Sequence, residues 1–266
     1  MPNLSNACDP SSSKRAQIAE ELYLAHGARH ASNRCDANSR LGTRDLLVEL
    51  VHALRIEPQH VVVDVCCGTG QHLIKFATLA SRAIGYDFSD AAVAEACRRG
   101  VEAYVADAAC LPLPDGSVDA LNCAFGVYYL NDLKEAIREW QRVLKPGGRI
   151  VISGPATGTN VELYEFHRQA TGYGPSDADT IACGYVDGLV HTELSAGAFR
   201  DVTVDVFINP VEFPDAASFI DYWRSTSVFL RSTGADVETG VRLLARREGP
   251  FRVTKRVSIA SATRTT

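Results

Sequence analysis

Long apolar runs, a strong charge of one sign and paired cysteine motifs are all absent from this 266-residue sequence. No apolar run approaches the roughly 20 residues needed to cross a bilayer, and residues 1–17 contain no apolar core like that of a signal peptide. The formal net charge of −5 gives no electrostatic footprint for a phosphate backbone. We therefore expect a cytoplasmic monomer or homodimer that acts on a small molecule, with no nucleic acid and no membrane insertion.

The cysteines match neither a disulfide framework nor a metal site. All eight occur without a CxxC pair, and several lie inside apolar runs, where thiols pack as small hydrophobic groups. His26, His30 and Cys35 lie close together in the sequence, but their spacing fits no standard zinc pattern. We therefore expect reduced thiols and no bound metal.

Apolar runs alternate with helical patterns along residues 44–154, which is typical of an α/β protein built from βαβ units. Strands are expected at 60–66, 82–87, 102–107, 118–126 and 149–154, and helices at 44–55, 70–81, 89–99 and 132–144. Ser89 is suited to cap the third of these helices, and Gly100 to end it. Two later strands, at 199–208 and 251–262, would close the sheet as an antiparallel pair.

Three acidic residues, Asp64, Asp87 and Asp107, each stand at the carboxyl end of a successive predicted strand. In an open parallel sheet, ligands bind outside these ends, at the point where the strand order reverses. Asp87 follows the first glycine-rich loop by roughly 20 residues, where a carboxylate accepts hydrogen bonds from the two ribose hydroxyls of a nucleotide. The alternative is that each aspartate only caps a helix.

The stretch "VVVDVCCGTGQH", residues 61–72, joins an apolar strand to a glycine-containing turn. A dinucleotide fingerprint needs a third glycine, but Leu73 stands in that position, and no Gly-Lys-Ser/Thr follows for a phosphate loop. Gly68 and Gly70 allow a close approach of the backbone to a ligand. The loop therefore indicates a nucleoside that carries something other than phosphate.

The two adjacent cysteines of this stretch stand where a first glycine would be expected. Neighbouring residues on an extended strand point to opposite faces, so we expect Cys66 and Cys67 not to face each other. A disulfide between them would be strained. We predict Cys66 close to the ligand and Cys67 packed nearby, both as reduced thiols.

Four segments together resemble the class I S-adenosylmethionine-dependent methyltransferases: "VVVDVCCGTG", "AIGYDFS", "AYVADAACLPLPDGSVDALNCAFGVYYL" and "LKPGGRIVIS". The small-molecule branch that includes ubiquinone and menaquinone biosynthesis enzymes is the most similar. The resemblance covers residues 44–154 and, more loosely, 190–264; Cys66 departs from it, since the family usually has glycine there.

The resemblance implies a Rossmann-like α/β fold with a seven-stranded sheet, mostly parallel with an antiparallel final strand and helices on both faces. It divides the chain into an N-terminal tail and cap helix at 1–40 and a methyltransferase domain at 41–266. Within that domain we expect a lid insertion at about 155–190 and substrate-side helices at about 214–248.

The same resemblance implies S-adenosylmethionine as the cofactor and a set of residues around it. Asp64 would anchor the methionine end, Asp87 the ribose, and Phe88 would lie against the adenine. The remaining cofactor-binding residues that it implies are Cys66, Gly68, Gly70, Asp107, Ala108, Cys123 and Phe125. For Phe125 and Tyr128, which follow the fourth strand, ordinary packing at a helix start is the alternative.

Methyl transfer from a sulfonium chiefly requires alignment of the nucleophile and exclusion of water, so a general base matters only for a protonated acceptor. His167, three residues after Tyr164 on an expected helix, and Tyr128 are the candidate catalytic residues. A solvent-exposed lid histidine is the alternative for His167. The stripe formed by Phe219, Tyr222 and Trp223 is expected either in the core or along the acceptor pocket.

These observations predict a methyltransferase that modifies an O, N or C atom of a small molecule, in specialised metabolism. Two alternatives stay open. The chain could bind S-adenosylmethionine without methylating, as a pericyclic catalyst or a regulatory module, or it could be an NAD-dependent oxidoreductase. Leu73 and the antiparallel end of the sheet argue against the oxidoreductase.

Overall fold

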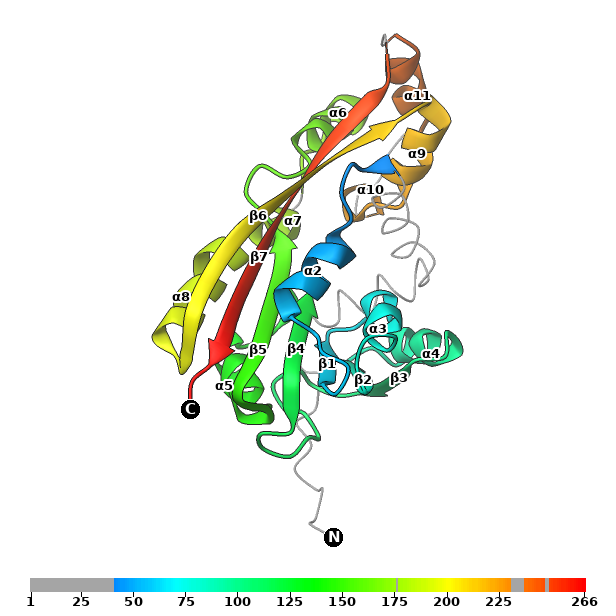
Figure 1. The fold of residues 1–266 in the computed structure, drawn as a ribbon. Helices are drawn as coiled ribbons and strands as arrows, with labels where there is room; N and C mark the ends of the chain where they lie inside the picture. Colours follow the sequence, from blue (N-terminus) through cyan, green and yellow to red (C-terminus); the bar gives the residue numbers. More distant parts are fainter. Residues whose placement is uncertain (1–40, 176, 231–236, 247–248) are drawn as a thin grey trace.

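The computed structural model describes residues 41–175, 177–230, 237–246 and 249–266 (Figure 1). The expected N-terminal tail and cap helix, at 1–40, and the triplet His26, His30 and Cys35 lie outside the described residues. Among the described helices, none has the length and apolar character needed to span a membrane.

Seven strands form one sheet in the order β3-β2-β1-β4-β5-β7-β6. The strands are β1 (Val61–Val65), β2 (Arg82–Asp87), β3 (Glu102–Val105), β4 (Val118–Ala124), β5 (Leu144–Pro155), β6 (Phe199–Phe213) and β7 (Phe251–Arg264). Strands β1 to β5 pair in parallel, and β7 lies antiparallel between β5 and β6. The expected sheet is confirmed, and its strand order reverses between β1 and β4, which is where ligands bind in such sheets.

Helices cover both faces of the sheet (Figure 1). One face buries apolar residues of α2 (Leu46–Leu54), α3 (Gln71–Phe76) and α4 (Asp90–Arg98). The other buries residues of α5 (Leu133–Val143), η3 (Val186–Val190) and α8 (His191–Ala196). Both α4 and α5 begin at a side-chain cap, since Ser89 accepts from the Ala92 amide and Asp132 from the amides of Lys134 and Glu135.

Strands β6 and β7 extend past the end of β5 and carry a second, smaller core (Figure 1). Its helices are α6 (Val161–Thr171), α9 (Ala216–Arg224), α10 (Ser227–Leu230) and α11 (Val237–Ala245). Aromatic rings fill it: Phe219 stacks on Phe251 with centroids 3.8 Å apart, and Phe166 meets Trp223 edge-on at 5.0 Å. We call this region the aromatic lobe. The core interpretation of the stripe Phe219, Tyr222 and Trp223 is confirmed, because all three are buried.

Several boundaries differ from those expected from the sequence. The helix expected at 70–81 ends at Phe76, because Thr78 and Ser81 use their hydroxyls to bond the carbonyls of Lys75 and His60. The segment 155–190, expected as a weakly structured insertion, contains α6 and the short helix α7 (Asp177–Ala182). Leu163 and Phe166 of α6 are buried in the aromatic lobe, so this part of the insertion has a packed face.

Candidate functional site

A single carboxylate joins the loops that follow β1 and β2. The Gly68 amide donates to Asp87 Oδ2 at 2.8 Å, and the Ser89 amide donates to Asp87 Oδ1 at 3.0 Å. These two bonds fix the turn after β1 and the start of the connection after β2 to one buried side chain. Asp87 lies at the strand end where the ribose hydroxyls were expected.

Asp64 lies beside this loop at the centre of the sheet, with only 1% of its surface exposed. Asn122 of β4 donates to Asp64 Oδ1 at 2.7 Å, whereas Asp64 Oδ2 and Asn122 Oδ1 have no hydrogen-bond partner among the described residues. Burial raises the pKa of Asp64 to about 7, although the bond from Asn122 opposes that shift. A buried carboxylate with an unpartnered oxygen suits a cationic group on a ligand.

The raised pKa of Asp64 predicts a pH dependence of stability. Because the folded-state pKa lies above the ordinary value of 3.8, this group's contribution is full below pH 3.8 and is lost as the pH rises through about 7. The loss follows a slope of up to about 1.4 kcal/mol per pH unit. Urea unfolding between pH 4.5 and 8 measures this loss. The free energy of unfolding should change less with pH in Asp64→Asn than in the unmodified protein, and parallel changes in the two proteins would contradict the raised pKa of Asp64.

The turn after β1 has a left-handed backbone at three of its positions. The angle φ is 55° at Cys66, 53° at Gly68 and 75° at Gly70. The strand ends at Val65, so the expectation that Cys66 lies on an extended strand is wrong. Cys66 adopts the conformation that favours glycine, which is the residue that the resembling family has there.

The two cysteines of the turn lie against glycines of different strands. A Cβ on Gly126, just after β4, would lie 2.2 Å from Cys66 Cβ, and a Cβ on Gly85 of β2 would lie 2.6 Å from Cys67 Sγ. Their side chains therefore point apart. Because residue 126 is glycine, the Cys66 side chain has space at a position where the resembling family usually has glycine. The sequence shows no link between residues 66 and 126, which are 60 positions apart.

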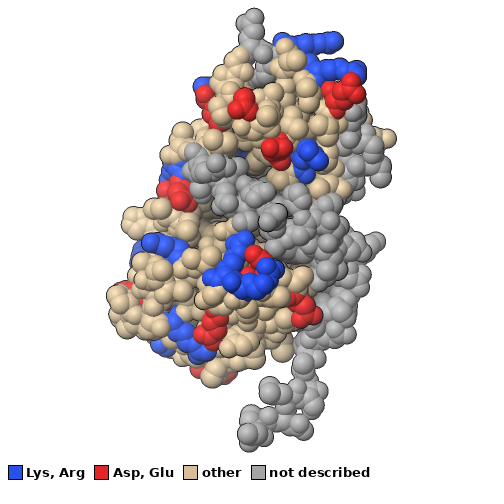
Figure 2. Space-filling view, turned by 90° about the vertical axis from the view of Figure 1, so that its right-hand side faces the viewer, with Lys and Arg blue, Asp and Glu red and all other residues tan. Residues whose placement is uncertain are grey.

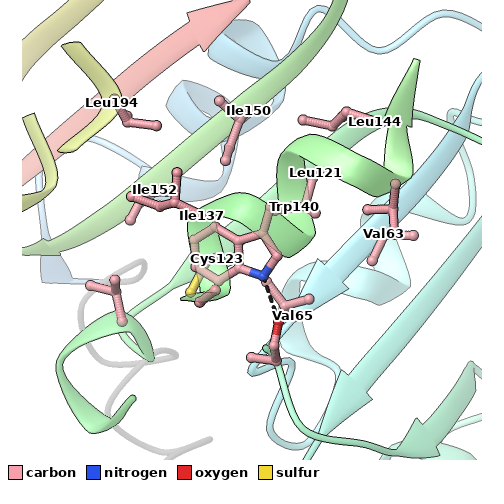
Figure 3. Close-up of a cluster of buried hydrophobic side chains, with 14 of the residues drawn as sticks. Val63, Val65, Leu121, Cys123, Ile137, Trp140, Leu144, Ile150, Ile152 and Leu194 are labelled. Atoms are coloured by element: carbon pink, nitrogen blue, oxygen red, sulfur yellow. Dashed lines mark hydrogen bonds between the residues drawn. The ribbon is translucent and has the colours of Figure 1, made fainter. Parts of the chain in front are cut away.

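The segment after β3 is held by α5. Asp107 Oδ1 accepts from the Ala109 amide at 2.8 Å, and the Ala108 carbonyl accepts from Trp140 Nε1 at 2.8 Å (Figure 3). Glu139, next to Trp140, accepts from the Leu111 amide at 2.7 Å. Sequence reasoning missed Trp140 and Glu139, because the periodicity predicts their helix but not partners about 30 residues away.

Three of the expected residues follow or end β4. Cys123 is buried on β4, beside the turn after β1. Phe125 has a left-handed backbone with φ of 58° and is 36% exposed, while its amide donates to the Ser153 carbonyl at 2.8 Å. Tyr128, in η2 (Val127–Tyr129), packs partly buried against the core next to Gly154. The exposure of Phe125 is consistent with a ligand contact, and Tyr128 shows the packing that was its alternative.

His167 does not lie on an exposed lid. It is fully buried on α6, and its Nδ1 accepts from Trp223 Nε1 at 3.0 Å. Burial lowers the pKa of the imidazole. With Nδ1 as acceptor, a neutral ring carries its proton on Nε2, so the nitrogen that would take up a proton is already bonded. The expectation of a solvent-exposed histidine is wrong, and we assign His167 to the structure of the aromatic lobe rather than to proton transfer.

On the face in Figure 2, Lys and Arg side chains of the described residues are interspersed with Asp and Glu. This face therefore shows no continuous field of one sign among the described residues.

A comparison with known protein families agrees with the resemblance found in the sequence. Residues 63–152 match the family model described as a methyltransferase domain. Its limits run from the middle of β1 to β5, so they include Asp64, the turn after β1, Asp87, Asp107 and Cys123. The expected resemblance to class I S-adenosylmethionine-dependent methyltransferases is confirmed.

Two curated relatives are similar to part of this chain. The chain is 34% identical over 108 residues to demethylmenaquinone methyltransferase of Mycolicibacterium gilvum, and this match covers 41% of this chain and 47% of that protein. It is 32% identical over 100 residues to the enzyme of Corynebacterium efficiens, covering 38% and 44%. The chain thus spans about half the length of the curated relatives that it matches.

Solved structures share the fold at low sequence identity. The YcgJ protein of Bacillus subtilis superposes with a TM-score of 0.56 and 16% identity, covering 83% of this chain and 98% of that one. Geranyl diphosphate C-methyltransferase of Streptomyces coelicolor gives 0.51 and 18%, covering 82% and 78%. The [4+2]-cyclase SpnF gives 0.51 and 21%, covering 83% and 81%. These similarities show the fold.

Proposed function

We propose that this chain binds S-adenosylmethionine at the carboxyl ends of β1, β2 and β4 and transfers its methyl group to a small-molecule acceptor. The observation that carries the proposal is the arrangement around Asp87, a buried carboxylate that fixes the Gly68 and Ser89 amides beside the strand-order switch. The matched methyltransferase domain supports it, since that domain contains these residues.

The buried groups fit this cofactor. The ammonium of its methionine end would partner the unpartnered Asp64 Oδ2, and its ribose hydroxyls would bond Asp87. Gly70 sets the shape of the turn, because its φ is 75° and a Cβ there would lie 2.9 Å from Val101 Cγ2. Phe88 and the Asp107–Ala108 segment would border the adenine, and Cys66, Cys123 and Phe125 the sulfonium end.

The bound cofactor would supply an activated methyl group with a neutral sulfur leaving group. The protein's part is then to orient and to exclude water. Asp87 and the turn after β1 would fix the position of the nucleoside, and Phe125 would border the acceptor. We assign no protein base, so the acceptor atom would be an oxygen, nitrogen or carbon that is nucleophilic without one.

The family match ends at residue 152, so it does not include α7, α6 or the rest of the aromatic lobe. We propose that the segment 155–190 and the helices at 214–248 form the acceptor side within a domain at 41–266, and that the acceptor belongs to specialised metabolism. The curated relatives are named as demethylmenaquinone methyltransferases, so demethylmenaquinone is one acceptor to test.

Transfer of a labelled methyl group tests the proposal. The protein should move label from methyl-labelled S-adenosylmethionine to a compound in a metabolite extract, with S-adenosylhomocysteine formed in equal amount. Asp87→Ala at the same concentration is the control and should transfer far less. Cofactor binding without any transfer to a broad set of acceptors would instead favour a non-methylating role, such as the cyclase activity named for SpnF.

A further inference from the structure

Two thiols from different strands, Cys66 and Cys123, lie against each other beside the turn after β1. Both residues are free cysteines. A Cβ on Gly126 would lie 2.7 Å from Cys66 Sγ and 3.6 Å from Cys123 Sγ, so the two sulfurs border the same point. Nothing in the proposed methyl transfer requires this pair.

The backbone brings the two residues within reach of a covalent bond. Val65 and Cys123 are Cα partners in the parallel pairing of β1 with β4, and Cys66 is one residue further along. Neighbouring strands lie about 4.8 Å apart and consecutive Cα atoms about 3.8 Å apart, so the Cα atoms of Cys66 and Cys123 are on the order of 6 Å apart. Disulfides span Cα separations of about 4.4–6.8 Å, so the pair could be bridged with little backbone movement.

We propose that Cys66 and Cys123 form a reversible disulfide that fixes the turn after β1 against β4 and lowers the affinity of the crevice for its ligand. Cys67 takes no part, because its sulfur lies against Gly85 on the other side of β1. Formation of the disulfide does not depend on the proposed function. The effect of the disulfide on ligand binding, for which S-adenosylhomocysteine is the probe, rests on the proposed function.

The oxidant is a peroxide, and the reaction balances in two steps. The Cys66 thiolate attacks one peroxide oxygen, so that the O–O bond breaks, a sulfenic acid forms and hydroxide leaves. The Cys123 sulfur then attacks the Cys66 sulfur, forming the S–S bond and releasing the sulfenic oxygen as water. The two thiols lose two electrons and two protons, and hydrogen peroxide becomes two waters.

Access and acidity set the order and the rate of these steps. Cys66 is partly exposed and Cys123 is fully buried, so the oxidant reaches Cys66 first. The hydrogen bond with Cys123, together with burial, raises the pKa of the Cys66 thiol. Because the thiolate is the reactive form, oxidation should be slow near neutral pH and faster in alkaline buffer.

Mass spectrometry and calorimetry on the full chain test this proposal. After hydrogen peroxide at pH 9 in the absence of ligand, the protein should lose 2 Da per pair by the chemistry above, and peptide mapping should join Cys66 to Cys123. Mapping is needed because the chain has eight cysteines. Cys67→Ser should still form the link, and Cys66→Ser should not.

The affinity measurement uses S-adenosylhomocysteine as the probe. The oxidised protein should bind it at least tenfold more weakly than the reduced protein, with recovery after dithiothreitol. A map that lacks the Cys66–Cys123 link, or one that joins Cys66 to Cys67, overturns the proposal, as does unchanged affinity in the linked protein. If the reduced protein itself fails to bind the probe, the proposed function fails, and the mapping still decides whether the pair forms.

Discussion

Replacing Asp87 with alanine is expected to weaken S-adenosylmethionine binding by on the order of tenfold to a hundredfold. Each hydrogen bond to a charged group contributes roughly 1.5–3 kcal/mol, and the variant removes those from the ribose. It also frees the amides of Gly68 and Ser89, which Asp87 holds at 2.8 and 3.0 Å, so the turn after β1 loses its fixed position. Isothermal titration calorimetry measures the change.

Asp90→Ala is the matched control for this variant. Asp90 lies three residues further along the same connection but is exposed, so its loss should leave the affinity within about twofold. Thermal unfolding of Asp87→Ala shows whether the protein is folded, and Asp87→Asn, which keeps the shape of the side chain, serves if alanine unfolds it. A folded Asp87 variant with unchanged affinity would contradict the assignment of Asp87 to the ribose.

Gly126→Ala is expected to lower the free energy of unfolding by about 3 kcal/mol, at the upper end of the usual cost of overpacking. The new Cβ would lie 2.2 Å from Cys66 Cβ, and a Cβ cannot move away by a rotamer change. Adding Cys66→Gly should restore most of that loss, because it removes the clashing atom and places glycine where φ is 55°. Urea unfolding of the two single variants and the double variant measures this coupling.

Gly174→Ala is the control, because a Cβ there meets no atom of the described residues within 4 Å. It should change the free energy of unfolding by less than about 1 kcal/mol. Additive effects of Gly126→Ala and Cys66→Gly would show that the two residues do not share one space, and the account of the cysteine in the turn would then be wrong.

The sequence was sufficient for the sheet and for the acidic side of the crevice. Alternation of apolar runs with helical patterns identifies β1 to β5, and the ends of those strands carry Asp64, Asp87 and Asp107. Such features depend on residues near one another in the chain, where periodicity and turn chemistry are informative. The alternative that Asp87 caps the next helix is wrong, because Ser89 is the N-cap of α4 and Asp87 instead holds the amides of Gly68 and Ser89.

Contacts between distant residues could not be predicted in the same way. Three contacts join residues 32 to 60 positions apart. They are the close approach of Gly126 to Cys66, the bond from Trp140 to the Ala108 carbonyl, and the bond between Trp223 and the buried His167. A helical stripe shows that a face is apolar, but it does not show which partner covers it. His167 was therefore expected on a lid, although the aromatic lobe encloses it.

Calorimetric titration of the reduced chain with S-adenosylhomocysteine at pH 8, where Asp64 is ionised, tests most directly whether the carboxyl ends of β1, β2 and β4 hold the cofactor. We predict one site per chain and an affinity that falls on the order of tenfold to a hundredfold in Asp87→Ala. The affinity should also weaken as the pH is lowered through about 7, and this dependence should be absent in Asp64→Asn. No binding by the folded protein, or binding that is indifferent to both aspartates, would contradict the claim that this crevice holds the cofactor.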